Sequence, residues 1–323
     1  MLSCLKTLIR LVCLPVAASL TCGVVSAQDL KRIRVSIIPI IDVAPMMAAS
    51  KQGFFAKEGL QIDTSPTTGG AVGIPALIGG AVDIAFGNVV STMLAASQGL
   101  DVKVLAPSTN MTDGPTASVL IGRKGDNYRG AADFSGKTIG VNTRNGINML
   151  YSRAWVKARG GDPDKVAYKE VPFPQIGDAV KRRQIDAAIT GEPFKGAFLK
   201  DPELAIVGSP FIEVQSGLDV GQYLTTSAYA AQNPDTIVKF MRALRKGIVW
   251  YNDNLASQEV AELVSEYTRI PVATVKGLKL MPLPTRVNVG QIQKTVELMF
   301  SDGMIKSKID VEKFVLPIAV SGD

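Results

Sequence analysis

The chain has 323 residues, with 35 Lys and Arg, 29 Asp and Glu, no histidine and three cysteines. The cysteines are Cys4, Cys13 and Cys22, so the chain after Cys22 has neither thiol nor imidazole. This composition excludes a disulfide framework, a Ser-His-Asp or Cys-His triad and a His- or Cys-based zinc site in that part of the chain. Because no dense basic run with interleaved aromatics occurs, we expect no nucleic-acid binding.

The first 27 residues have the pattern of a secretory signal. Lys6 and Arg10 give a basic start, an apolar stretch follows, and Val25-Ser26-Ala27 is a small-residue cleavage site. We expect cleavage after Ala27 and a periplasmic mature chain. The alternative is a retained anchor, although the apolar stretch is short and broken for a membrane span. Without these residues the balance is 33 basic to 29 acidic residues.

Strand and helix patterns then alternate. Short β-rich runs occupy 33–38, 60–66, 82–87 and 102–107, and helical patterns occupy 45–59, 71–80 and 91–99. Pro45 suits a first helical turn, and Gly59 suits a helix stop. This order predicts a largely parallel sheet with helices on both faces.

The same order begins again further along. Strands are predicted at 137–142, 166–173 and 185–190, with helices at 147–161 and 176–184. Asp83 and Asp186 occupy matching places, each before an apolar run, and we interpret them as turn or capping groups. The chain therefore has two α/β lobes of related layout.

The last third of the chain has too few strands to form a domain of its own. A helix is predicted at 233–254, because Ile237, Phe240, Met241, Leu244 and Ile248 follow helical spacing. Further helices are predicted at 256–268 and 289–303. We expect this part to pack on the first lobe, which makes 28–116 and 222–323 lobe 1 and 117–221 lobe 2.

Ligands of open parallel sheets bind beyond the carboxyl ends of the strands, where helix N-termini favour an acidic group. Five such ends, at 40–45, 68–71, 87–91, 142–147 and 190–193, would line one cleft. Several residues there also have a structural interpretation. Gly69 and Gly70 could form a turn, Asn88 a helix cap, Glu192 a solvated loop residue, and Arg144 a cation facing water.

Three motifs together resemble a known family: "GFFAKEGL", "GGAVDIAFGN" and "IDAAITGEP". They are similar to the substrate-binding proteins of ABC importers in the NMT1/THI5-like group, which includes nitrate, sulfonate and taurine receptors. The resemblance implies an α/β, two-lobed type II periplasmic binding protein with two crossing hinge strands. It also implies ligand contacts at Pro45, Gly70, Asn88, Asn145 and Glu192. This chain departs from better-known members in having no tryptophan near those loops.

We therefore expect a non-enzymatic receptor that delivers a small acidic or zwitterionic ligand to an ABC permease in the inner membrane. Alternatives are a ligand-presenting partner of a sensor kinase, or a pyrimidine-precursor synthase, which needs His and Cys chemistry. We expect a monomer without cofactor or metal. The candidate ligand-binding residues are Asp42, Ala44, Pro45, Gly69, Gly70, Ala71, Asn88, Val89, Val90, Thr143, Arg144, Asn145, Gly146, Pro174 and Glu192.

Overall fold

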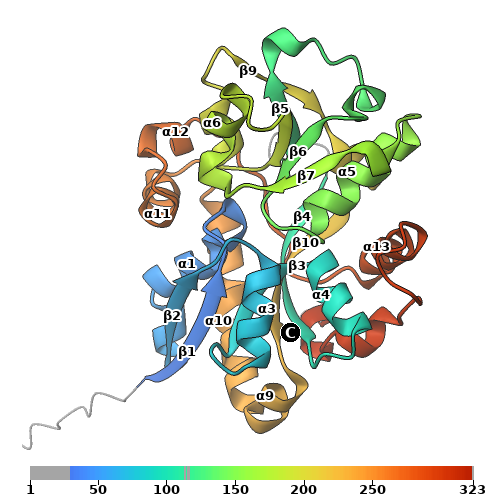
Figure 1. Ribbon diagram of the computed structural model, residues 1–323. Helices are drawn as coiled ribbons and strands as arrows, with labels where there is room; N and C mark the ends of the chain where they lie inside the picture. Colours follow the sequence, from blue (N-terminus) through green and yellow to red (C-terminus); the bar gives the residue numbers. More distant parts are fainter. Residues whose placement is uncertain (1–29, 113, 115–116, 322–323) are drawn as a thin grey trace, which may run out of the picture.

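The computed structural model describes residues 30–112, 114 and 117–321. They form two α/β lobes, each built on a five-stranded sheet flanked by helices (Figure 1). The predicted fold class is confirmed. The predicted signal peptide and its cleavage after Ala27 lie outside the described residues. Within the described ranges, no helix has the length and apolar character needed to cross a membrane.

The sheet of the first lobe has the strand order β2-β1-β3-β10-β4. Its strands are β1 (Lys31–Ile37), β2 (Leu60–Pro66), β3 (Ile84–Asn88), β4 (Lys103–Met111) and β10 (Leu218–Thr225). β1, β2 and β3 are parallel, and β10 inserts antiparallel between β3 and β4. The register between β10 and β4 shifts three times, which marks irregularities in this ladder.

The sheet of the second lobe has the equivalent order β7-β6-β8-β5-β9. Its strands are β5 (Val119–Arg123), β6 (Thr138–Val141), β7 (Ala167–Glu170), β8 (Ala187–Thr190) and β9 (Leu204–Gly208). In both sheets the first parallel strand, β1 or β6, lies between the other two. The chain crosses between lobes from β4 to β5 and again into β10.

Asp83 and Asp186 have the same structural role in the two lobes. The Asp83 amide donates to the carbonyl of Arg34, and its carboxylate accepts from the Arg34 amide at 2.8 Å. The Asp186 amide and carboxylate make the same pair of bonds with Thr138, the second also at 2.8 Å. Each aspartate therefore fixes the start of one strand against its parallel neighbour, as the capping interpretation predicts.

Helices cover both faces of each sheet. The first lobe carries α1 (Ala44–Lys51), α2 (Phe54–Lys57), α3 (Gly70–Ile78), α4 (Val89–Ser97), α9 (Ser227–Gln232) and α10 (Pro234–Asp253). The helix predicted over 45–59 is interrupted, because Gly53 has a φ of 71°, a left-handed conformation that glycine adopts without strain. The five apolar residues that predicted α10 are all buried.

The second lobe carries α5 (Ile147–Ala158), α6 (Ile176–Lys181), α7 (Phe194–Phe198) and α8 (Pro210–Val214). Short 3-10 helices occur at Ile41–Val43, Lys124–Asp126, Ala131–Phe134, Pro163–Lys165, Phe173–Gln175 and Val311–Phe314.

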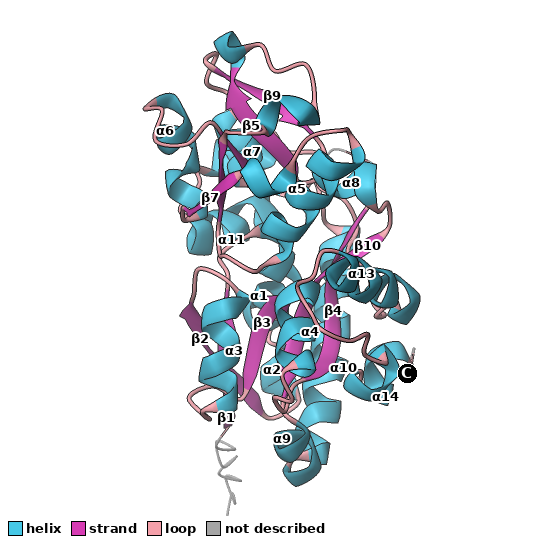
Figure 2. Ribbon diagram, turned by 45° about the vertical axis from the view of Figure 1, so that its right-hand side comes forward, coloured by secondary structure: helices cyan, strands magenta, loops and turns pink. Residues whose placement is uncertain are grey.

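The C-terminal part contains α11 (Gln258–Thr268), α12 (Val272–Lys276), α13 (Val289–Ser301) and α14 (Pro317–Val320). In Figure 1, α11 and α12 lie on one side of the junction between the lobes and α13 on the other, and Figure 2 shows α11 and α13 separated in the same way. α13 packs on α4 and β10, and α12 also contacts α7 of the second lobe. This part therefore packs on lobe 1 and also touches lobe 2 where α12 meets α7.

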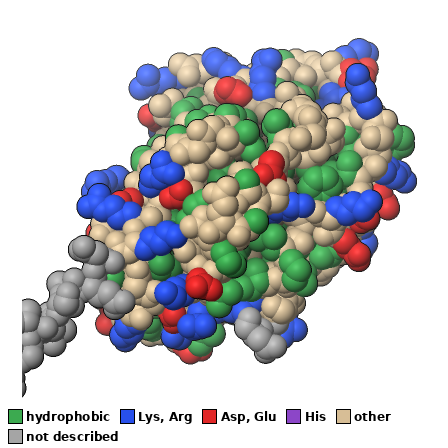
Figure 3. Space-filling model, turned by 90° about the horizontal axis from the view of Figure 1, so that it is seen from below, with side chains coloured by type: hydrophobic (Ala, Val, Ile, Leu, Met, Phe, Trp, Pro, Cys, Tyr) green, Lys and Arg blue, Asp and Glu red, His purple; other side chains and the backbone are tan. Residues whose placement is uncertain are grey.

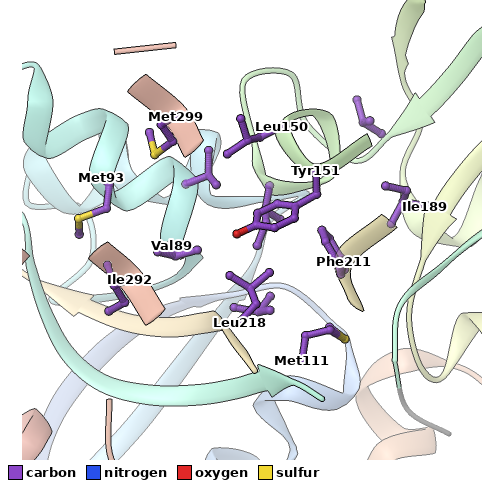
Figure 4. Packing of buried hydrophobic residues seen from close by; sticks show 14 of the residues in the cluster. Val89, Met93, Met111, Leu150, Tyr151, Ile189, Phe211, Leu218, Ile292 and Met299 are labelled. Atoms are coloured by element: carbon purple, nitrogen blue, oxygen red, sulfur yellow. The ribbon is translucent and has the colours of Figure 1, made fainter. Parts of the chain in front are cut away.

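One hydrophobic cluster continues from lobe to lobe beside the hinge. Figure 4 shows Val89 and Met93 of α4, Leu150 and Tyr151 of α5, and Ile292 of α13 in a single packed group. The Tyr151 ring lies edge-on to Phe211 of α8 with 5.2 Å between ring centroids. Its hydroxyl bonds Thr295 at 2.9 Å and donates to Gln215 at 2.8 Å. The polar tip of this buried ring is therefore satisfied.

Candidate functional site

A cavity of about 80 Å³ lies between the lobes. It is lined by the carboxyl ends of β1, β3, β4 and β8, by the start of α5, by β10, and by residues 281–283 between α12 and α13. The carboxyl ends of parallel strands are where open α/β sheets place ligands, because the following helices point their N-termini there. The two lobes thus contribute opposite walls of one enclosed space.

Asn88 ends β3 and lines the cavity from the first lobe. It also caps α4, since its side-chain oxygen accepts from the Ser91 amide at 3.0 Å. Its amide group donates to the Ser91 hydroxyl at 3.2 Å. Both interpretations made from the sequence therefore hold for the same side chain. An amide has two hydrogens and two lone pairs, so capping leaves hydrogen-bonding capacity for a ligand.

Glu192 follows β8 and lines the cavity from the second lobe. Its carboxylate is 5% exposed and pairs with the Lys195 ammonium at 3.0 Å. The other carboxylate oxygen accepts from the Gly196 amide at 3.0 Å. Sequence reasoning missed Lys195, although it lies one helical turn after Glu192. The charge of Glu192 is thus balanced within its own lobe, and the solvated-loop interpretation is wrong.

Asp42 follows β1 and lines the cavity near β10. Burial raises the pKa of Asp42 to about 6, and a hydrogen bond from Thr109 partly opposes that rise. The Asp42 carbonyl accepts from the Ser108 hydroxyl at 2.6 Å. No Lys or Arg of the described chain forms an ion pair with this carboxyl.

The aromatic part of the lining was missed from the sequence. Phe86, Phe173, Phe211 and Tyr251 come from four distant segments and meet at the cavity. Neither tryptophan is there: Trp155 lies inside α5 and donates to Glu213 at 3.0 Å, and Trp250 lies in α10. The four rings supply flat apolar surface in place of the tryptophans that the sequence lacks near these loops.

Polar residues at the end of β4 were also missed. Thr109 and Asn110 line the cavity, but the predicted strand stopped at Pro107. β4 continues to Met111 because proline lacks only its own N–H donor, and β10 pairs with β4 on both sides of it. Ser118, Asn142, Asn148 and Thr190 add polar groups to the lining from the second lobe.

Several sequence candidates lie in the core and not in the lining. Ala44, Val89 and Val90 are fully buried apolar residues. Pro45 faces α10, where its carbonyl would lie 2.3 Å from a methyl group placed on Gly247. Of the three candidates after β1, which are Asp42, Ala44 and Pro45, only Asp42 lines the cavity.

The Gly69–Gly70 pair lies where the lobes touch. A methyl group on Gly69 would lie 2.5 Å from Cγ2 of Thr143 in the opposite lobe. Next to it, the side chain of Asn142 donates to the Thr68 carbonyl at 3.0 Å. Gly70 packs on Ser91, and Ala71 is exposed. These glycines therefore permit close approach of the two lobes, and they do not line the cavity.

The loop before α5 also points away from the cavity. Arg144 is exposed; its amide donates to Glu170 at 2.6 Å and its guanidinium to the Tyr168 carbonyl at 2.7 Å. Asn145 is exposed with a φ of 54°, and Gly146 begins α5 behind it. Pro174 is on the outer surface, whereas its neighbour Phe173 reaches the lining.

The charged side chains of the described lining are all acidic. Asp42 and Glu192 are acidic, and Lys and Arg do not occur in the part of the lining that the structure describes. Within 30–112, 114 and 117–321, no group of His, Cys, Asp and Glu is arranged to hold a metal ion. On the face drawn in Figure 3, basic side chains are scattered among acidic, polar and apolar ones and form no basic patch.

Comparison with known proteins places this chain among binding proteins of one family. The model of the NMT1/THI5 like family matches residues 40–254. A putative ABC transporter periplasmic binding protein of Brachyspira hyodysenteriae is 26% identical over 306 residues, covering 85% of this chain and 86% of that protein. A putative aliphatic sulfonates-binding protein of Bacillus subtilis is 24% identical over 300 residues, covering 89% and 86%.

Solved structures share the fold. The periplasmic nitrate-binding protein NrtA from Synechocystis PCC 6803 superposes with a TM-score of 0.76 at 16% identity, covering 90% of this chain and 87% of that one. Other relatives are named as binding proteins for riboflavin, formylaminopyrimidine and bicarbonate.

Proposed function

Because this chain belongs to the NMT1/THI5-like family, whose members compared above are binding proteins, we propose that it is a periplasmic receptor for one small solute. The solute is held between the lobes and delivered to an ABC permease in the inner membrane. The observation that carries this proposal is the cavity between the lobes at the carboxyl ends of both sheets. Relatives of this kind act outside the cytoplasm, which agrees with the signal predicted over 1–27.

The cavity favours a small solute. Its volume of about 80 Å³ is below the 300–1,000 Å³ typical of pockets for drug-sized ligands. A ligand as large as riboflavin would require the lobes to part, whereas a single small ring or a short chain would not. The relatives named above are named for solutes of very different size, so the volume of this cavity favours the smaller of these solutes over the larger.

Closure around a ligand is the property to test first. The mature chain, residues 28–323, is stripped of bound solute by unfolding and refolding, then mixed with a low-molecular-weight extract of cells. We expect a monomer whose radius in small-angle scattering decreases with the extract, because ligand favours the closed arrangement. An unchanged radius, with no rise in melting temperature, contradicts the receptor function.

Asn88 and Glu192 are proposed as ligand contacts from the two lobes. Asn88→Ala and Glu192→Gln are each expected to weaken binding of the extracted solute by about 1–3 kcal/mol, the usual cost of leaving a buried polar partner unpaired. Asn88→Asp is the matched control, since it keeps the cap of α4 and removes the amide donor. Wild-type affinity in all three variants would place the contacts elsewhere in the lining.

A further inference from the structure

We infer that the solute carries a protonated nitrogen, which pairs with Asp42 at the floor of the cavity, and a flat apolar part that lies against the aromatic rings. This inference rests on the proposed function and names the chemistry of its ligand. The sequence led us to expect an acidic or zwitterionic ligand, and the inference departs from the purely acidic part of that expectation. That expectation depended partly on Arg144, which is exposed and bonded within its own lobe.

The two acids of the lining differ in what balances them. Glu192 has the Lys195 ammonium at 3.0 Å and the Gly196 amide at 3.0 Å. Asp42 has a hydroxyl, Thr109, and its own backbone, but no basic group among the described residues. A buried carboxylate without a counter-charge is costly, and a cationic ligand would remove that cost on binding.

Asp42 and Thr109 lie side by side at Gly221 of β10, and all three residues line the cavity. A methyl group on Gly221 would lie 3.0 Å from the Thr109 hydroxyl, 3.1 Å from a carboxylate oxygen of Asp42 and 3.1 Å from the edge of the Phe86 ring. A side chain at residue 221 would therefore crowd these two oxygens, and glycine avoids this. Two neighbouring oxygens in the lining suit a ligand N–H donor.

The described groups around Asp42 carry no positive charge that could balance its carboxylate, so a ligand would have to supply one. Tyr223 of β10, Tyr251 of α10 and Tyr267 of α11 lie near it, and burial raises the pKa of each phenol, so they stay neutral. The other charged residue of the described lining is Glu192, which pairs with Lys195. Aromatic faces attract cations as well, which adds to the preference for a protonated nitrogen.

The test uses sets of probes that share a shape and differ in charge. Benzylamine, benzyl alcohol and benzoate form one set, and 2-phenylethylamine with its alcohol and acid forms another; taurine, nitrate and a short alkanesulfonate are added. Wild-type mature protein is compared with Asp42→Asn and Gly221→Ala by thermal shift and calorimetry. Asp63→Asn is the matched control, because it removes one carboxylate at an exposed position outside the cavity.

We expect an amine to bind best, and both cavity variants to lose at least tenfold in affinity while Asp63→Asn loses none. Burial raises the pKa of Asp42 to about 6, and an alkylammonium group stays charged over pH 5–8. Wild-type affinity should therefore fall on the order of tenfold for each pH unit below 6, whereas Asp42→Asn should lose this dependence.

Three results would overturn the inference. An acid or alcohol that binds as tightly as its amine, or an amine that binds Asp42→Asn as well as wild type, refutes the role of Asp42 but leaves the receptor function standing. A panel in which no amine binds refutes it as well. If the cell extract also fails to change the scattering radius, the receptor function itself fails.

Discussion

The lobes meet along two seams of opposite character. The apolar seam is formed by Tyr151, Phe211, Leu218 and Ile292 beside the hinge, within one continuous hydrophobic cluster. The polar seam is formed by short contacts such as Asn142 to the Thr68 carbonyl, the Ile41 amide to the Glu192 carbonyl, and Lys200 to Thr274. Both seams join the same two sheets, but they are held by different forces.

The difference assigns the two seams different parts in a closing movement. Burial of apolar surface stabilises the folded arrangement in proportion to the buried area, and exposing that surface to water again is costly. A neutral hydrogen bond contributes only about 1 kcal/mol net, since water replaces the partner when the bond breaks. We therefore expect the lobes to stay joined along the apolar seam and to separate along the polar seam. The following predictions test this contrast.

Removal of the central ring of the apolar seam should have the largest effect. Tyr151→Ala leaves a cavity beside Phe211 and strands two hydrogen-bonding partners, so the free energy of unfolding should fall by about 3–5 kcal/mol. Tyr151→Phe is the matched control, because it keeps the ring and should cost about 1–2 kcal/mol. Urea unfolding measures both. Equal losses in the two variants would show that the ring itself contributes little.

The next effect concerns Asp219, a buried acid beside the apolar seam. One carboxylate oxygen of Asp219 accepts a hydrogen bond from the backbone N–H of Asn288 at 2.8 Å. Burial raises the pKa of Asp219 to about 7. Because the folded pKa exceeds the unfolded value near 3.8, the folded state binds more protons between these pH values. The free energy of unfolding should therefore fall by up to a few kcal/mol as pH rises from about 4 to about 7.

Asp219→Asn checks this dependence. The amide keeps an acceptor for Asn288 but cannot ionise, so unfolding free energies measured over this pH range should decline less steeply than in wild type. Asp42 contributes a decline of the same sign below about pH 6, which remains in the variant. A slope identical to that of wild type would mean that Asp219 is already ionised at low pH.

A methyl group added where the lobes touch along the polar seam should weaken ligand binding more than it destabilises the fold. Gly69→Ala places a methyl group against Thr143, whose β-branched side chain cannot easily rotate away. The φ of Gly69 is extended, at 172°, so the substitution adds bulk without backbone strain. We expect about a tenfold weaker affinity for the solute, which is about 1.4 kcal/mol, and a larger radius in scattering.

Gly130 provides the matched control for this substitution. Its φ of 173° is nearly the same, and a methyl group there meets nothing within 4 Å. Gly130→Ala should therefore leave both affinity and radius unchanged. If the two alanine variants behave alike, contact at Gly69 does not limit closure.

The smallest effect is expected at the rim of the polar seam. Lys200 is exposed and donates to the Thr274 hydroxyl at 2.8 Å, linking α7 to α12 across the lobes. Lys200→Met keeps most of the side-chain length and removes the bond. The loss in unfolding free energy should be below about 1 kcal/mol, as is usual for exposed polar pairs. A loss larger than that of Tyr151→Phe would reverse the contrast between the seams.

The sequence predicted the fold well because its signals are local. Alternating strands and helices, and the matching Asp83 and Asp186, depend on residues near one another in the chain. The cavity was predicted less well because its lining is assembled from distant segments. Phe86, Phe211 and Tyr251 look like ordinary core residues in their own elements, and only the packing of the lobes brings them together.

Site prediction also failed where neighbouring residues point in opposite directions and where a charged side chain is bonded within its own lobe. Pro174 was chosen, but the chain turns so that Phe173 faces inward. Arg144 was a plausible anion ligand by type, and its carbonyl and carboxylate partners on β7 became visible only in three dimensions. Asp42, Asn88 and Glu192 line the cavity because residues at or shortly after the carboxyl end of a parallel strand have little choice of position, and their contact with a ligand stays a prediction.

The two strands that form the hinge also form the cavity floor. Thr109 and Met111 of β4 line the cavity just before the chain leaves the first lobe, and Val220 and Gly221 of β10 line it just after the chain returns. A solute resting there touches the joint that sets the angle between the lobes. In the proposed receptor, occupancy would therefore change the angle between the lobes directly, without any relay of side chains. A membrane partner that contacts both lobes could distinguish a loaded receptor from an empty one by the spacing of the two surfaces it grips.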